Sequence, residues 1–380
     1  MLFILQQYWW LIVTLLGSIL VFLLFVQGGQ TLFFGTAKNE EEKSLLVNAF
    51  GHKWEFTFTT LVTFGGAMFA SFPLYYSTSF GGAYWLWITI LFLFVIQAVS
   101  YEFRKKAGNL LGSKTYEFFL FLNGMFGTIF LGIAVGTFFT GGSFVMNKME
   151  ITDIARPVIS YWTNSWHGLD AATVPFNLLM GIGLFLVART LGLLFVINHI
   201  DSDSLVSKAR ARVKVTGVAF VLGFIGILVY MSLLTGYSVD PDTNYITAVK
   251  YKYFLNYIEL KWTLVMLLVG VVLVLIGLAM VFFKKDRNSF YVTGAGVVLA
   301  VWSLLIGAAF NNTAFFVSTV DSQYSLTLYN SSSSLFTLKT MAYVSLLVPF
   351  VLAYIYFAWR ALTKNKITAK EINDPDSIKY

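Results

Sequence analysis

Long apolar segments dominate this chain and restrict it to a membrane fold. Nine stretches are apolar enough and, at about 20 residues or more, long enough to cross the roughly 30 Å hydrocarbon core of a bilayer as helices. Only 12% of the residues are charged, against roughly 25% in soluble domains. We therefore expect an all-α integral membrane protein without a water-soluble catalytic domain. The expected spans are 8–34, 54–76, 81–101, 115–140, 172–197, 213–234, 262–283, 290–310 and 336–359.

The spacing of the spans suggests how this single membrane domain, residues 1–380, is divided. The longest loop on the side of the N-terminus follows the fourth span. We therefore expect two four-helix bundles, 8–140 and 172–310, then a final helix at 336–359 and a tail at 360–380. No convincing internal repeat relates the two bundles.

Basic residues are distributed very unequally between the two sides of the expected membrane domain. If nine helices alternate in direction, 19 of the 26 Lys and Arg residues fall in the loops after odd-numbered helices and in the C-terminal tail. The opposite loops contain only Lys148, Arg156, Lys250 and Lys252. Because cytoplasmic loops carry an excess of basic residues, the N-terminus is predicted outside and the C-terminus in the cytoplasm. Topology thus explains the net charge of +7 without a nucleic acid partner.

Few side chains in the sequence could hold a redox centre. The chain contains no Cys, which excludes thiolate metal sites and iron–sulfur clusters. Haem in a membrane subunit needs axial ligands, usually His or Met, that project into the protein interior. His52, His167 and His199 are expected in loops or at a helix end, and Met in apolar helices usually serves packing. We therefore expect the chain alone to bind neither metal nor haem.

Four of the ionisable residues within or beside the expected helices are candidates for a function, because burial in lipid is costly. Glu55, Glu102 and Glu117 are placed at cytoplasmic helix ends. An acid near a helix N-terminus is an ordinary feature that fits Glu55 and Glu117. The functional alternative is proton entry, because a carboxyl group sheltered from water can exchange protons near neutral pH. Arg189 is interpreted either as a cation extending to the membrane surface, or as part of an ion pair or a lipid or quinone head-group contact.

Three Gln residues are predicted to gather in the inner third of the membrane. Gln27 lies 19 residues, roughly 28 Å at helical rise, from the outer end of the first span. Gln30 follows one turn later, and Gln97 in the third span belongs at the same depth. We expect these amides to form a polar cluster.

Two blocks of motifs, far apart in the chain, carry a family resemblance. The first contains Lys53-Trp54-Glu55, the segment LVTFGGAMFASFP at 61–73, and Tyr101-Glu102-Phe103-Arg104. The second contains SLTL at 325–328, SS at 333–334 and TL at 337–338, before Met341 and Pro349. Together they resemble subunit II of the cytochrome bd quinol oxidases, over essentially the whole chain and with the same number of helices.

The resemblance implies a haem-free partner of a larger subunit I, which carries two b-type haems and one d-type haem and oxidises quinol. The complex would reduce oxygen to water and take protons from the cytoplasm, contributing to the proton motive force. The resemblance also implies a multi-pass protein of a bacterial or archaeal plasma membrane. It allows a bound quinone or lipid, oxygen access through apolar cavities, and a small single-helix third subunit.

Three positions depart from the family pattern in a consistent way. The acids of the family's first helix appear here as Gln27 and Gln30, and an Arg late in the third helix appears as Gln97. Because the negative and the positive charges are both replaced at the same depth, we expect an uncharged hydrogen-bonded cluster in place of an ion-pair cluster. Such a replacement avoids leaving a lone buried charge. A proton route through those acids is therefore not expected in this chain.

Glu55 becomes the first candidate for a proton path, because Trp54 and Glu55 match the family's Trp-Asp pair with Glu in place of Asp. Glu102 and Glu117 are second, and no residue of this chain is expected to be catalytic itself. A stand-alone transporter or proton channel is the alternative, although it would favour interrupted helices and a polar cluster at the midplane. A purely structural scaffold is also compatible with the sequence.

Overall fold

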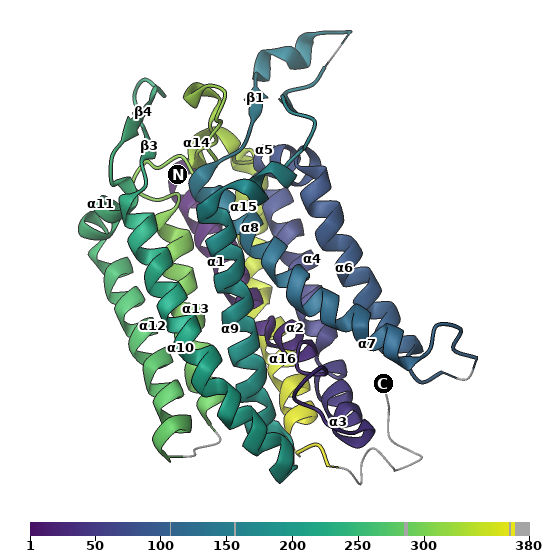
Figure 1. Ribbon diagram of the computed structural model, residues 1–380. Helices are drawn as coiled ribbons and strands as arrows, with labels where there is room; N and C mark the ends of the chain where they lie inside the picture. The colour runs from purple at the N-terminus through teal and green to yellow at the C-terminus, as the bar shows by residue number, and fades with distance from the viewer. Residues whose placement is uncertain (107, 156, 285–287, 365, 369–380) are drawn as a thin grey trace.

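A computed structural model describes residues 1–106, 108–155, 157–284, 288–364 and 366–368 of the chain. Long helices form most of the described structure, and two short antiparallel hairpins lie in loops at one end of it (Figure 1). In these hairpins β1 (Phe144–Met146) pairs with β2 (Ser160–Trp162), and β3 (Gly236–Val239) pairs with β4 (Ile246–Val249).

Eight helical segments of the described chain are long and apolar enough to cross a membrane. The expected second span also forms a helix, α4 (Trp54–Ser71), but it is not among these eight. Glu55 and four Thr residues make it less apolar than the other spans, so the ninth crossing stays a prediction. The eight segments are Leu2–Gln30, Tyr84–Phe103, Ser113–Thr140, Pro175–His199, Asp203–Leu233, Lys261–Phe283, Ser289–Gly307 and Leu335–Thr363.

Several expected spans consist of more than one helical piece. The first is α1 (Leu2–Leu23) followed by α2 (Phe25–Gln30). In the second, α4 ends at Ser71 and α5 (Pro73–Tyr76) begins at Pro73. The helix is interrupted there because proline lacks an N–H and its ring clashes with a continuing helix. The fourth is α7 (Ser113–Leu122), a π-helical turn at Asn123–Gly127, and α8 (Thr128–Thr140). The last joins α15 (Leu335–Val344) to α16 (Val348–Thr363) through a single 3₁₀ turn.

The remaining helices complete the bundle. α10 begins ten residues before the expected start of its span, because its basic first segment continues the helix beyond the apolar run. The helices are α3 (Glu40–Gly51), α6 (Tyr84–Phe103), α9 (Pro175–His199), α10 (Asp203–Leu233), α11 (Lys252–Glu259), α12 (Lys261–Ala279), α13 (Ser289–Gly307) and α14 (Leu328–Ser331).

The N-terminus and both hairpins lie at one end of the bundle, whereas α3 and the end of α16 lie at the other (Figure 1). This arrangement agrees with alternating helices, while the orientation in the membrane stays a prediction. Helices of the two predicted halves pack together directly: α9 contacts α2 and α8, and α1 contacts α13. The division into halves also stays a prediction. Part of the predicted tail, 369–380, and the basic residues Arg156, Lys285, Arg287, Lys370 and Lys379 lie outside the described residues.

Glycines allow α9 to approach its neighbours closely. A Cβ on Gly132 of α8 would lie 2.6 Å from the Cα of Gly181 on α9. A Cβ on Gly28 of α2 would lie 1.9 Å from the carbonyl oxygen of Ala188 on α9. Small residues at such crossings let membrane helices gain van der Waals contact. The central position of α9 therefore depends on residues without side chains.

The short helix α3 is fastened to α10 by one carboxylate. Asn39 caps α3 by accepting the N–H of Glu42 at 2.8 Å. Glu42 in turn accepts hydrogen bonds from the backbone N–H of Lys38, from Ser204 and from Lys208, each at 2.7 Å. Burial by itself would raise the pKa of Glu42, but these donors outweigh it and hold the pKa below its ordinary value of 4.5. The ionised carboxylate therefore stabilises the fold.

We expect the contribution of Glu42 to depend on pH. A lowered pKa in the folded state means that the stabilisation is complete above about pH 4.5 and disappears as the pH falls through the folded-state pKa. Glu42→Gln should therefore lower the thermal midpoint of the purified complex at pH 7 and have a smaller effect at pH 4. Glu41→Gln, at an exposed neighbouring position, is the control. A deficit of equal size at both pH values would contradict the prediction.

Candidate functional site

Four buried amides meet where α2, α6 and the π-helical turn come together. The side-chain oxygen of Gln97 accepts hydrogen bonds from Gln27 at 2.7 Å, from Gln30 at 2.6 Å and from Asn123 at 2.6 Å. Asn123 also donates to Gln30 at 3.0 Å. All four side chains belong to residues that are fully buried. The structure thus brings Gln27, Gln30 and Gln97 together and adds Asn123, which sequence reasoning missed.

The amide cluster is polar but carries no formal charge. Three donors on one oxygen exceed its two lone pairs. Meanwhile Nε2 of Gln97, Oε1 of Gln27 and Oδ1 of Asn123 have no hydrogen-bond partner in the described part of the chain. Each unpaired buried group costs free energy. The cluster therefore joins three helical segments while keeping some of its polar atoms unsatisfied.

A stacked pair of aromatic rings connects the amide cluster to Trp54. Gln30 donates to the hydroxyl of Tyr101 at 3.1 Å. The Tyr101 ring stacks on Trp54 with centroids 6.2 Å apart and planes 16° apart. The indole Nε1 of Trp54 is buried without a partner. Glu55, the next residue, is exposed and makes no hydrogen bond or ion pair with the described residues.

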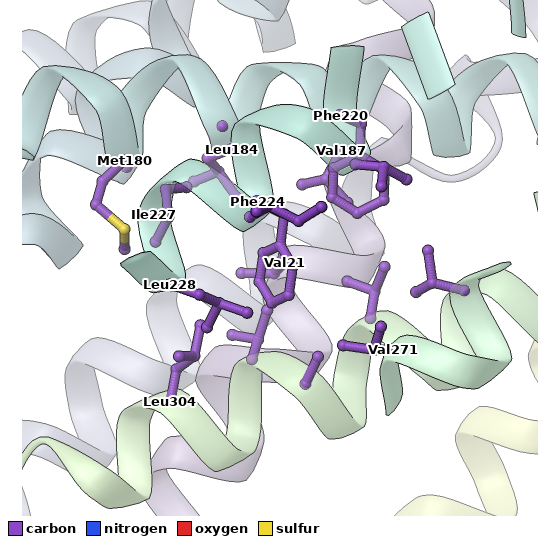
Figure 2. A pocket seen from close by; sticks show the side chains of 18 of the residues that line it. Val21, Met180, Leu184, Val187, Phe220, Phe224, Ile227, Leu228, Val271 and Leu304 are labelled. Atoms are coloured by element: carbon purple, nitrogen blue, oxygen red, sulfur yellow. The ribbon is translucent and has the colours of Figure 1, made fainter. Parts of the chain in front are cut away.

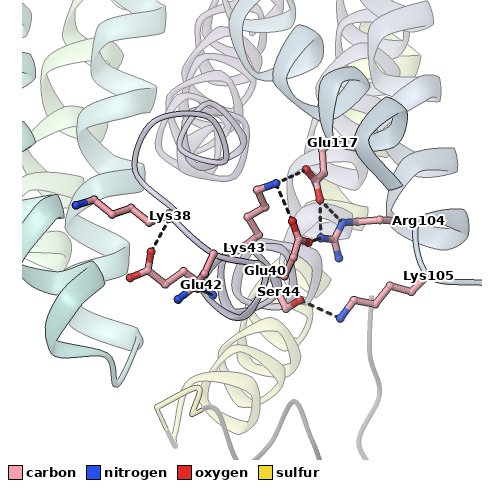
Figure 3. A network of polar contacts seen from close by, with 9 residues as sticks. Lys38, Glu40, Glu42, Lys43, Ser44, Arg104, Lys105 and Glu117 are labelled. Carbon is pink, nitrogen blue, oxygen red and sulfur yellow. Dashed lines mark hydrogen bonds and ion pairs between the residues drawn. The ribbon is translucent and has the colours of Figure 1, made fainter. Parts of the chain in front are cut away.

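Glu117 lies in a buried ion-pair network at the same end of the molecule (Figure 3). One carboxylate oxygen accepts from Nη2 of Arg104 at 2.6 Å and from its Nε at 3.1 Å. The other accepts from Nζ of Lys43 at 3.2 Å. Glu40, which is exposed, completes the network at 3.0 Å from Lys43 and 3.7 Å from Arg104. Only 1% of the Glu117 and Arg104 side chains is exposed, so this pair is an anchor of α7 to α6.

The third predicted acid, Glu102, lies outside this network. It is exposed and pairs with Lys106 one turn along the chain. Neither it nor Glu117 lies in the first turn of a helix. Glu55 does lie in the first turn of α4, so the helix N-terminus interpretation fits Glu55 and not Glu117.

Arg189 is half-buried on α9 and turns toward the end of α2. Its Nη1 donates to the carbonyl oxygen of Thr31 at 3.2 Å and to the Thr31 hydroxyl. No acidic side chain of the described residues forms an ion pair with it. Of the interpretations made from the sequence, an internal ion pair is therefore absent from the described part of the chain.

A cavity of about 170 Å³ lies between α1, α8, α9, α10, α12 and α13 (Figure 2). Its wall consists of apolar side chains, among them Val21, Leu184, Phe220, Phe224 and Val271. Cavities of this size with aliphatic and aromatic walls stay dry and admit small apolar molecules. The cavity is therefore suited to a gas or a hydrocarbon chain and not to an ion.

Two of the histidines, His167 and His199, use ring nitrogens in hydrogen bonds within the chain, which does not fit axial ligation of haem. His199, at the end of α9, lies 2.8 Å from the Tyr291 hydroxyl through Nε2 and 3.3 Å from the Phe195 carbonyl oxygen through Nδ1. His167 lies 3.3 Å from the carbonyl oxygen of Gly82. Within the described ranges no three His, Asp or Glu side chains are grouped so that they could hold a metal ion.

The sequence matches the family model described as cytochrome bd terminal oxidase subunit II over residues 5–362. The chain belongs to this family. It is therefore a multi-pass membrane subunit of a quinol oxidase complex, a haem-containing assembly in which a subunit I is its partner.

Curated relatives extend over almost the same length. Subunit 2 of the cytochrome bd ubiquinol oxidase of Bacillus subtilis is 28% identical, with 89% of this chain and 90% of the relative covered. Subunit 2 of the cytochrome bd-I ubiquinol oxidase of Escherichia coli K12 is 24% identical, with 94% and 93% covered. A probable cytochrome oxidase subunit 2 from Haemophilus influenzae is 25% identical, with 92% of each covered.

A solved structure supports the fold. The structure of bd oxidase from Geobacillus thermodenitrificans contains a chain that superposes with a TM-score of 0.64 and 14% identity. The match covers 95% of this chain and 99% of that chain. At this identity the likeness concerns the fold alone, and the residues that act in this chain have to be argued from its own geometry.

Proposed function

We propose that this chain binds no haem, inserts with its C-terminus in the cytoplasm, and helps to supply cytoplasmic protons to a haem-carrying subunit I. The complex would use these protons to reduce oxygen to water while it oxidises quinol. The observation that carries the proposal is Glu55, an exposed acid at the inner end of α4 that has no counter-ion among the described residues. A carboxylate in that setting can accept and release a proton without first breaking an ion pair.

The surroundings of Glu55 favour a protein partner on that side. Thr59, Thr63 and Gly66 follow Glu55 along α4 at helical spacing, and all four residues are exposed. In contrast, the exposed residues of α10 from Val215 to Leu233 are mostly large aliphatic ones. Polar and small residues on a membrane helix usually face protein and not lipid.

The other two acids are weaker candidates for proton transfer. Both oxygens of Glu117 are engaged by cations, and Glu102 is paired with Lys106 in water. Trp54 precedes Glu55 in the chain and stacks on Tyr101, so it can hold the local structure at the start of α4. We assign proton uptake to Glu55, with Trp54 as a positioning residue.

The apolar cavity is compatible with oxygen access and with a bound quinone or lipid. Oxygen, or the hydrocarbon tail of a quinone or lipid, could enter a cavity with such walls at little cost. Polar substrates could not, and this is one reason to prefer an oxidase subunit over a stand-alone transporter.

Glu55→Gln should slow quinol-driven oxygen consumption by the complex, whereas Glu55→Asp should retain most of it. Gln cannot carry a proton, while Asp keeps the ionisable group with a shorter side chain. We expect a loss on the order of a hundredfold for Gln, because one positioned proton-transfer group contributes at least that much. The measurement is oxygen uptake by the purified complex in detergent, with the haem spectrum of subunit I as the test of assembly.

Glu41→Gln is the matched control, since Glu41 is an exposed acid on α3 at the same end of the molecule. It should leave turnover unchanged. Equal rates for Glu55→Gln and Glu55→Asp, in complexes that assemble fully, would remove Glu55 from the proton path.

A further inference from the structure

Two arginines from different helices converge on one short segment of backbone. Arg189 of α9 binds the carbonyl oxygen and hydroxyl of Thr31. Arg212 of α10 donates through Nη2 to the carbonyl oxygen of Gly35. Thr31 and Gly35 are four residues apart in the turn after α2, and Arg212 is close enough to repel the charge of Arg189. The fold therefore brings two like charges together.

These charges are not balanced inside the chain. Neither arginine forms an ion pair with an acidic side chain in the described ranges. Glu42, an acid near the same turn, is already bound to Lys208, Ser204 and the N–H of Lys38. Capping of backbone carbonyls explains the bonds that the arginines make. It does not explain why two positive charges are placed on one turn while no acidic side chain of the described residues pairs with either of them.

Both arginines lie at the depth of lipid phosphates. Arg189 is ten residues from the end of α9, and Arg212 is nine residues from the start of α10, so each is about 14–15 Å from the inner end of its helix. After Lys214, α10 carries no further charge as far as Leu233, and at helical rise the run from Val215 to Leu233 spans about 29 Å, close to the thickness of the hydrocarbon core. Arg212 is thus at the boundary between hydrocarbon and head groups.

The site is open and has apolar surroundings on its membrane side. A guanidinium carries five N–H donors, and Arg189 and Arg212 are both only partly buried, so a ligand can reach donors that they do not use. Ile182, two turns from Arg189 on the same face of α9, is 43% exposed. Val215, one turn from Arg212, is 72% exposed. Cations at head-group depth with exposed aliphatic residues beyond them match a phospholipid.

We infer that Arg189 and Arg212 form a site for the phosphate of an anionic phospholipid in the leaflet on the side of α3, the cytoplasmic leaflet in the proposed orientation. The guanidinium groups would bind the phosphate oxygens in the bidentate manner that Arg allows. Basic pockets between membrane helices bind lipid head groups in the same way. The bound anion would neutralise the two charges and fix α9 and α10 against the turn after α2.

The test uses the intact oxidase complex, stripped of lipid by detergent washing. Phosphatidylglycerol, phosphatidylcholine or inorganic phosphate is then added, while retained lipid is measured by native mass spectrometry and the thermal midpoint is recorded. Phosphatidylglycerol should bind the wild type and raise its midpoint, and inorganic phosphate should not. Arg189→Gln and Arg212→Gln should each weaken lipid retention roughly five-fold, the typical contribution of one arginine near an anionic surface.

Lys214→Gln is the control, because Lys214 is an exposed cation two residues from Arg212; it should bind lipid like the wild type. Arg212→Gln keeps the bond between Arg189 and Thr31, so it remains informative if Arg189→Gln fails to assemble. Equal retention by Arg212→Gln and the wild type would overturn the site. A response to inorganic phosphate as large as that to phosphatidylglycerol would overturn the lipid as ligand, and no response to either would mean that another group covers the arginines.

Discussion

Glu117→Gln should cost the oxidase most of its assembled complex, although Gln has nearly the shape of Glu. The substitution removes the negative charge that balances Arg104. It also removes one of the two carboxylates that pair with Lys43. Arg104 is only 1% exposed and would keep a single distant partner, Glu40 at 3.7 Å. Breaking a buried ion pair from one side costs about 3–5 kcal/mol, because the remaining charge is buried without compensation. Yield of the haem-containing complex and its thermal midpoint measure the effect.

The exposed pair of Glu102 and Lys106 provides a control with the same chemical change. More than half of each side chain is exposed, and exposed ion pairs contribute only about 0–1 kcal/mol. Glu102→Gln should therefore leave assembly intact. Combining Glu117→Gln with Arg104→Gln should recover part of the loss, since Lys43 and Glu40 still balance each other. A single Glu117→Gln variant as stable as Glu102→Gln would show that the buried network is not an anchor.

Depth and polarity were sufficient to predict the meeting of the three Gln residues. Counting residues at helical rise put Gln27, Gln30 and Gln97 at one level, and their side chains meet there through the oxygen of Gln97. Asn123 was not predicted, although an Asn flanked by glycines within an apolar span was a usable signal. A polar side chain in such a span is expected to find a partner inside the bundle.

Contacts between side chains of different helices were harder to predict from the sequence. Arg104 and Lys43 were counted only as cytoplasmic charges, yet the structure buries Arg104 against Glu117. Similarly, Arg212 was counted for orientation, while its position beside Arg189 depends on how α9 and α10 pack. Linear spacing gives the depth of a residue in the membrane but not the helix that faces it. Contacts between distant segments therefore had to come from the structure.

The break of the first span at Leu24 has a similar origin. The sequence runs from Leu2 to Gln30 as one apolar segment, and one continuous span was expected there. In the structure, α2 is pressed against α9 at Gly28 and Gly29. The same contact positions Gln27 and Gln30, so the amide cluster and the helix crossing depend on each other.

Gly28→Ala should disturb both features and strongly reduce stable assembly of the complex. The added Cβ would lie 1.9 Å from the carbonyl oxygen of Ala188 and 2.4 Å from the backbone nitrogen of Arg189. Backbone atoms cannot turn away as a side chain can, so α2 and α9 would have to move apart. Overpacking typically costs about 1–3 kcal/mol, and a clash with backbone belongs at the upper end of this range or beyond it. Thermal midpoint and yield of the complex report the loss.

Gly226→Ala tests whether the loss comes from the crossing itself and not from any Gly→Ala change in a membrane helix. Gly226 lies in α10, and a Cβ there meets no atom within 4 Å. Because Ala is the better helix former by about 1 kcal/mol, this variant should be as stable as the wild type or slightly more so. Gly28 sits between Gln27 and Arg189, so its replacement should also weaken the amide cluster and phospholipid retention together. If Gly28→Ala assembles like Gly226→Ala, the close crossing of α2 and α9 does not organise this end of the subunit.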